Sequence, residues 1–172
     1  MAKEVLLLYT YITTGTYYFM KKIADQYPNE TMILMVSPVT VQLWHETDGA
    51  TIFKSPRKYE VIHSSGTWAE KGFVACHHIP VRDEGRPVFE YDFIESVKNV
   101  EQFPGLIVMR VLRPLSSDTY ITMTMWNDKK AYNDWKDDLK QQIDLKIVKN
   151  TGIFAGPSYI STFAVGEEED QE

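Results

Sequence analysis

The stretch Phe103–Trp135, FPGLIVMRVLRPLSSDTYITMTMWNDKKAYNDW, decides the fold of this chain. Pro104-Gly105 ends a preceding helix, and Leu106–Arg113 then has the apolar and β-branched composition of a strand. A short turn leads into a second strand, Thr119–Trp126, whose side chains alternate between two faces. A capped helix that carries Trp135 follows. The stretch therefore predicts a helix, a β-hairpin and another helix in unbroken succession.

The residues on either side of this stretch predict two halves with similar element order. In the second half, a strand over Phe73–Val81 precedes the helix, and Pro157–Val165 forms the last strand. The apolar face of that helix holds residues at helical spacing, namely Phe89, Phe93, Val97 and Val100. The first half is predicted to have four strands, over Val5–Tyr11, Thr31–Val36, Val39–His45 and Thr51–Phe53. It is also predicted to have two helices, over Tyr17–Tyr27 and from Pro56 to about His63, which are capped by Thr16 and Ser55.

These patterns predict an α+β fold made of two ferredoxin-like halves with antiparallel sheets. Neither half is long enough to cover both faces of its sheet, so the two sheets should pack into one barrel-like core, with the helices outside. We assign residues 1–68 to the N-terminal half and 69–166 to the C-terminal half. The acidic residues 167–172 are expected to be a disordered tail.

Composition excludes several classes of protein. The chain has 172 residues, a formal net charge of −6 and no run of Lys or Arg, so a nucleic-acid partner is not expected. The N-terminal apolar run is too short for a membrane span or a signal peptide. The single cysteine, Cys76, excludes an internal disulfide and fits a buried side chain in a reducing compartment, so we expect a cytoplasmic protein.

The adjacent histidines His77 and His78 are the first candidates for chemistry. Because they follow each other on a strand, their side chains point to opposite faces, and they cannot chelate one metal together. Three interpretations remain open for them: a metal site completed from elsewhere, structural hydrogen bonding, or approach to a bound cofactor. No phosphate loop, nucleophile elbow or Cys/His pair supports a hydrolase.

Two tryptophans and two arginines are further candidates. Trp126 is more typical of core packing, whereas Trp135 could form the wall of a flat aromatic pocket. Arg110 and Arg113 suit a ligand carboxylate, or they pair with a structural carboxylate such as Asp118 across the hairpin.

Apart from its tail, the chain resembles a group that joins an antibiotic-biosynthesis-monooxygenase (ABM) domain to an N-terminal half of its own. The group contains bacillus-type heme-degrading monooxygenases and the staphylococcal target of RNAIII-activating protein. The resemblance rests on motifs that occur in the same order along the chain: Glu46-Thr47-Asp48-Gly49, Lys54-Ser55-Pro56, Tyr59-Glu60-Val61-Ile62, Glu84-Gly85-Arg86-Pro87, Phe103-Pro104-Gly105, Arg110–Leu115 and Ser117–Tyr120. It implies one chain that imitates the barrel other ABM proteins make by dimerising.

Heme-degrading members are expected to use an Asn on the first ABM strand, a Trp on the last helix and an iron-ligating His further along that helix. Here the Trp is Trp135, the Asn position is His77, and the His position falls near Leu145, where no histidine exists. The resemblance thus implies heme as cofactor, with His77 or His78 as the replacement iron ligand. Arg110, Trp126 and Trp135 are the other candidate contacts.

Three functions follow as hypotheses. The first is a heme-binding monooxygenase that opens the porphyrin with O2 and an external electron donor. The second is a non-catalytic regulatory or stress-response protein, with His63 and His78 as candidate modified residues. The third is a cofactor-independent monooxygenase acting on an aromatic or quinol substrate. The first and third hypotheses imply a small-molecule ligand, and the second implies a regulatory role. In each case we expect a monomer or a weak homodimer.

Overall fold

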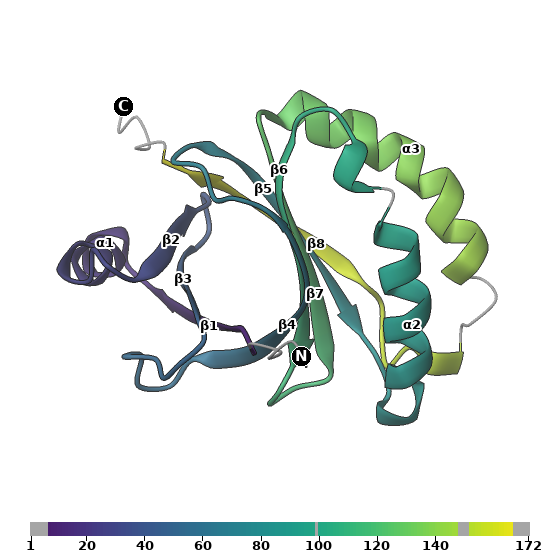
Figure 1. Cartoon of the computed structure of the whole chain (residues 1–172), viewed down its shortest axis with the longest axis horizontal. Helices are drawn as coiled ribbons and strands as arrows, with labels where there is room; N and C mark the ends of the chain where they lie inside the picture. The colour runs from purple at the N-terminus through teal and green to yellow at the C-terminus, as the bar shows by residue number, and fades with distance from the viewer. Residues whose placement is uncertain (1–6, 99, 148–151, 167–172) are drawn as a thin grey trace, which may run out of the picture.

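In a computed structural model, which describes residues 7–98, 100–147 and 152–166, eight antiparallel strands close into one barrel (Figure 1). The strand order around the barrel is β1-β3-β2-β8-β5-β7-β6-β4. The strands are β1 (Tyr9–Gly15), β2 (Thr31–Val36), β3 (Val41–Thr47), β4 (Arg57–Gly66), β5 (Gly72–Pro80), β6 (Leu106–Pro114), β7 (Thr119–Trp126) and β8 (Tyr159–Val165). The α-helices are α1 (Tyr17–Gln26), α2 (Arg86–Val97) and α3 (Lys129–Ile147), with 3-10 turns at Asp83–Gly85 and Val100–Gln102.

The two halves of the chain have the same sheet topology. In the first half the strands lie in the order β4-β1-β3-β2, and in the second half in the order β8-β5-β7-β6. In each half, therefore, the fourth strand lies beside the first, as in a ferredoxin-like sheet. The halves are joined by pairing of β2 with β8 and of β4 with β6, which closes the barrel. The predicted α+β fold with a pseudo-dimeric barrel is confirmed.

One predicted helix is wrong. The Ser55-Pro56 pair is typical of a helix start, but Arg57–Gly66 is strand β4. This strand pairs with β1 on one side and with β6 on the other, and these long-range hydrogen bonds outweigh the local start signal. The short strand expected over Thr51–Phe53 is also wrong, because these residues form a loop. Instead of a second helix, the first half has this loop, whose Phe53 ring lies 5.7 Å from that of His45.

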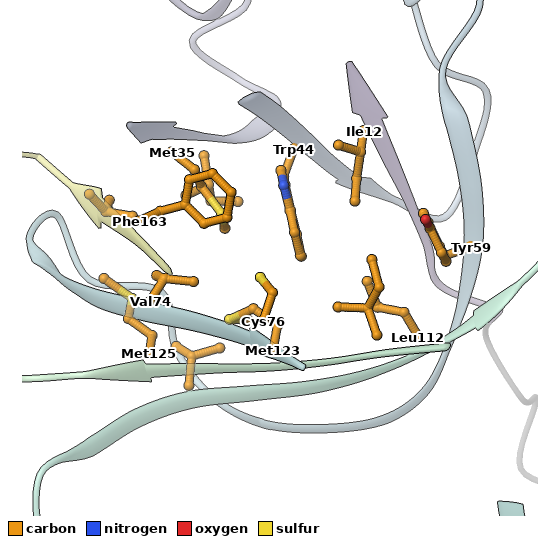
Figure 2. Packing of buried hydrophobic residues seen from close by; sticks show 14 residues of the cluster. Ile12, Met35, Trp44, Tyr59, Val74, Cys76, Leu112, Met123, Met125 and Phe163 are labelled. Atoms are coloured by element: carbon orange, nitrogen blue, oxygen red, sulfur yellow. The ribbon is translucent and has the colours of Figure 1, made fainter. Parts of the chain in front are cut away.

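Apolar side chains from both halves fill the inside of the barrel (Figure 2). Trp44 from the first half and Met123 from the second both point into this core, and each is at most 2% exposed. Cys76 is fully buried there, and burial raises the pKa of its thiol well above the ordinary value. The thiol therefore stays protonated and behaves as a small hydrophobe, as predicted.

A second apolar layer lies outside the barrel, beneath α2 and α3 (Figure 1). The two helices cover the face of the sheet formed by the second half, while α1 packs on β2 and β3. The start of α3 is fixed by Asp128, whose side-chain oxygen accepts the backbone N–H of Ala131 at 2.8 Å. Because β7 alternates, it serves both layers: Met123 points into the barrel, and Trp126 points toward the helices.

Candidate functional site

His77 faces the helical layer and lines a cavity of about 680 Å³. Its neighbours on β5, Cys76 and His78, point to the barrel side instead, so the predicted opposite orientation of the two histidines is what the structure has. The cavity lies between β5, α2, α3 and the segment before β8. It is lined mainly by apolar and aromatic residues: Ile79, Phe89, Phe93, Val97, Trp135, Phe154, Pro157, Tyr159 and Ile160, together with His77, Thr122, Gly156 and Ser158. None of these lining residues carries a formal charge at neutral pH.

Two rings from α3 hold the imidazole of His77 in place. The ring of Trp135 lies 5.9 Å away at 76°, and that of Tyr132 lies 6.2 Å away at 66°, both edge-on. The Tyr132 hydroxyl also lies 3.3 Å from Nε2 of His77, within hydrogen-bonding distance. Since Tyr132 and Trp135 are three residues apart on α3, one helix face supplies both rings.

Burial keeps His77 uncharged. Desolvation, followed by the positive charge of Lys136 and the neighbouring His78, lowers the pKa of His77 to about 4. At neutral pH its imidazole therefore has one N–H and one nitrogen lone pair. A lone pair on a neutral imidazole next to an apolar cavity could bind a metal ion held by a ligand, or could accept a proton.

Two further polar atoms belong to side chains that line the cavity. Thr122 lies directly opposite His77 in the β5–β7 ladder, and its hydroxyl is buried without a hydrogen-bond partner. The indole N–H of Trp135 is in the same condition. Buried polar groups without partners cost about 1–3 kcal/mol each. A buried polar group without a protein partner is explained by a bound water or ion, or by a functional role.

His78 does not line the cavity, because its ring lies on the barrel side of β5. Its Nε2 is 2.8 Å from the hydroxyl of Ser161, and its ring stacks on Tyr159 with 4.4 Å between centroids. Burial, with a contribution from the nearby charge of Arg57, lowers the pKa of His78 to about 4. His78 is thus a hydrogen-bonded structural residue on the opposite side of the sheet from His77.

Neither arginine lies in the cavity, and neither pairs with Asp118. Arg110 points into one end of the barrel, where its Nε donates to Glu46 at 2.7 Å and its guanidinium lies 5.3 Å from the Trp68 ring. Arg113 bridges carboxylates of two elements, Glu60 on β4 and Glu90 on α2. Both arginines therefore pair with structural carboxylates, which was one of the two interpretations of the sequence, but these carboxylates are not Asp118.

Of the five sequence-predicted cofactor contacts, the structure brings only His77 and Trp135 to the cavity. Trp126 is fully buried behind Trp135, with 5.1 Å between ring centroids. Sequence reasoning missed Tyr132 and Thr122 as site residues, although the alternation of β7 already placed Thr122 on the Trp126 face. Leu145, at the position expected for a helix histidine, lies on α3, but its side chain is outside the described residues.

The other two histidines each contact a carboxylate outside the cavity. His45 contacts Glu30 and Thr51, both at 2.9 Å, and His63 contacts Glu101 at 2.6 Å. Within the described ranges, no group of three or more His, Cys, Asp or Glu side chains could hold a metal ion. No helix in that same part of the chain is long and apolar enough to cross a membrane.

Comparisons with known proteins relate the chain to two differently named relatives. It is 32% identical to the signal transduction protein TRAP of Staphylococcus aureus (strain MSSA476) over 126 residues, which is 73% of this chain and 75% of that protein. It is 25% identical, with the same coverage, to a heme-degrading monooxygenase of Listeria monocytogenes. A solved L. monocytogenes ferredoxin-fold structure related to antibiotic biosynthesis monooxygenases superposes with a TM-score of 0.78 at 23% identity, covering 95% of this chain and 97% of that one. No family model matches the chain.

Proposed function

Since this chain belongs to the ABM family, in the branch that includes TRAP and the heme-degrading monooxygenases, we propose that it binds heme in the cavity beside β5. In this proposal His77 would hold the iron through its imidazole. The observation that carries it is the uncharged imidazole of His77, which lines an apolar cavity beside Trp135. Neutral imidazole is the usual protein ligand of heme iron.

The residues present fit the ring and the iron of heme. The cavity of about 680 Å³ falls within the range of ordinary ligand and cofactor sites, which is about 300–1,000 Å³. Aromatic walls such as Phe89 and Phe93 suit a flat macrocycle. None of the described lining residues is a cation, so in this proposal the two carboxylates of heme would lie at the mouth of the cavity, in solvent.

Each residue has a defined part in the proposed activity. His77 holds the ligand on the strand side, and Trp135 forms the wall beside it from α3. Phe89, Phe93 and Val97 exclude water from the cavity. Bound heme would supply the iron that takes up dioxygen and the ring that is opened. In this proposal an external reductant would supply the electrons.

A hemin titration of the purified protein tests this proposal. We expect a saturable shift of the Soret band at one heme per chain, and bleaching of that band when ascorbate is added in air. Trp135→Phe keeps a ring in the wall and should retain most of the binding. If no saturable shift appears at micromolar hemin, the heme proposal is wrong.

A second candidate function is the oxidation of an uncharged aromatic or quinol substrate without a cofactor. The described lining residues favour it, because they are uncharged and such a substrate has no carboxylate to place. His77 would accept the phenolic proton, and the substrate anion would then reduce dioxygen. Binding of 1-naphthol without binding of hemin would favour this function. Binding of neither probe would favour a regulatory role like the one that the name of TRAP describes.

A further inference from the structure

Tyr132 contacts the one imidazole on which the proposed function depends. Its hydroxyl lies 3.3 Å from Nε2 of His77. Among the described residues, this is the one hydrogen bond that the hydroxyl makes. An imidazole has only two nitrogens, so the nitrogen left for a ligand is Nδ1. We propose that Tyr132 is a positioning residue that engages Nε2 of His77 and leaves Nδ1 as the ligand-binding atom. This inference rests on the proposed function of the cavity.

The ring of Tyr132 is itself held firmly, as a positioning residue requires. It is 3% exposed and packs against Phe73 at 5.5 Å and Trp126 at 6.2 Å between ring centroids. The ammonium group of Lys136 lies 5.9 Å from the centroid of its ring, within the range of a cation–π contact. The hydroxyl therefore cannot move far from His77 without repacking of the layer beneath α3.

The Tyr132 hydroxyl can support either neutral form of His77. Burial raises the pKa of Tyr132 to about 12, so it keeps its proton at neutral pH. Without a ligand, the hydroxyl can donate to Nε2. If Nδ1 held a ligand, Nε2 would carry the ring proton and would donate to the oxygen of Tyr132. Rotation of one O–H bond and a change of tautomer suffice to switch between the two arrangements.

Residues that support a metal-bound histidine have a measurable effect. Removal of such a partner typically weakens metal binding about 10–100-fold, because the ring is less well oriented and its nitrogen is a weaker donor. We therefore expect Tyr132→Phe to weaken hemin binding by about 10-fold or more. The ring of the replacement fills the same space, so the packing beneath α3 stays intact.

The test compares three variants with the wild-type protein: Tyr132→Phe, His77→Ala and Tyr120→Phe. Tyr120 is a matched control, since it is buried under α2 on the same face of the sheet but donates to Glu90 and does not line the cavity. The first readout is the hemin dissociation constant. The second is the 15N chemical shifts of the His77 ring in ligand-free protein, which report the tautomer and the hydrogen bond at Nε2.

The proposal predicts weaker hemin binding and shifted His77 nitrogen resonances in Tyr132→Phe, with neither change in Tyr120→Phe. Hemin binding that is weak in His77→Ala but unchanged in Tyr132→Phe would overturn the positioning role and leave the proposed function standing. If His77→Ala binds hemin like wild type, the proposed function fails. The 15N resonances of the His77 ring then test the positioning role by themselves: a shift in Tyr132→Phe supports it, and no shift refutes it.

Discussion

At the scale of single residues, two adjacent histidines point to opposite faces of one strand. Strand alternation predicted that His77 and His78 face opposite sides, but not which of them would face the helices. That depends on the register of β5 with β7 and β8, which long-range packing sets. The choice of His77 and Trp135 came from the family resemblance, whereas Tyr132 looked like one more apolar position on a helix. Its role depends on a contact between residues 55 positions apart, which no local pattern contains.

His77 and His78, whose pKa values are lowered in the folded protein, should make the protein sensitive to mild acid. Each has a pKa of about 4 when folded and about 6.5 in an unfolded chain, so the unfolded state binds more protons between these values. Stability should therefore fall as the pH drops from 6.5 toward 4, by about 2 kcal/mol per histidine between pH 7 and pH 5. Urea unfolding at the two pH values measures this loss.

His78→Gln serves as the matched comparison for the acid effect. It removes one titrating ring on the barrel side of β5 and leaves His77 in place. The loss of stability between pH 7 and pH 5 should be roughly halved in this variant. An equal loss in wild type and variant would show that protonation of His78 does not cause the acid sensitivity.

Thr122 offers a second test at this scale, because its hydroxyl is buried without a partner. Thr122→Val removes that hydroxyl and should leave the ligand-free protein as stable as wild type, or more stable by about 1 kcal/mol. Thr124→Val is the control on the same face of β7, where the hydroxyl donates to the carbonyl of Ala75 at 3.5 Å. The control should lose stability by up to about 1 kcal/mol. Equal destabilisation of both variants in urea unfolding would contradict the assignment of Thr122.

At the scale of elements, most helices and strands followed from sequence periodicity. Thr31–Val36 and Thr119–Trp126 have the predicted bounds. Of the predicted apolar face, Phe89, Phe93 and Val97 are on α2, while Val100 is buried in the 3-10 turn that follows it. Strand β4 was missed because Ser55-Pro56 is a strong local helix signal. Its true conformation is set by hydrogen bonds to β1 and β6, and β6 begins some 40 residues further along the chain. Local propensity contains no information about such pairing.

The attachment of α2 to the sheet depends on Arg113, which bridges Glu60 and Glu90, while Tyr120 also donates to Glu90. Arg113→Leu leaves two partly buried carboxylates without a cation. We expect a loss of about 2 kcal/mol, below the value for a fully buried pair because the Arg113 side chain is 36% exposed. Lys130→Met, which breaks an exposed pair with Asp134 on α3, should cost at most about 0.5 kcal/mol. Similar losses in the two variants would refute the anchoring role of Arg113.

At the scale of the whole molecule, one chain closes a barrel from two ferredoxin-like halves. The sequence predicted this arrangement because neither half could cover its own sheet, and the family resemblance pointed the same way. It did not predict that the first half lacks a second helix. As a result, α2 and α3 cover only one side of the barrel (Figure 1). The cavity of about 680 Å³ is lined by residues of these two helices and lies on that side. The asymmetry of the helices thus determines where this site can form.

Because both seams between the halves are hydrogen-bonded strand pairs, the halves should unfold together. The core inside the barrel takes side chains from both of them, among them Trp44 and Met123, so unfolding of one half would expose the apolar side chains of the other (Figure 2). Thermal or urea unfolding followed by far-UV circular dichroism and by tryptophan fluorescence should give one coincident transition. Two separate transitions would show that the halves are independent folding units.

The central claim is that His77, on the helical side of β5, is the ligand-binding histidine of this protein. The most direct test is a hemin titration of His77→Ala beside His78→Ala, followed in the Soret region under identical conditions. The two variants remove neighbouring rings with similar pKa values from opposite faces of one strand. We predict at least a 10-fold loss of affinity and an altered Soret band for His77→Ala only. A wild-type spectrum in His77→Ala, or an equal loss in both variants, would contradict the account.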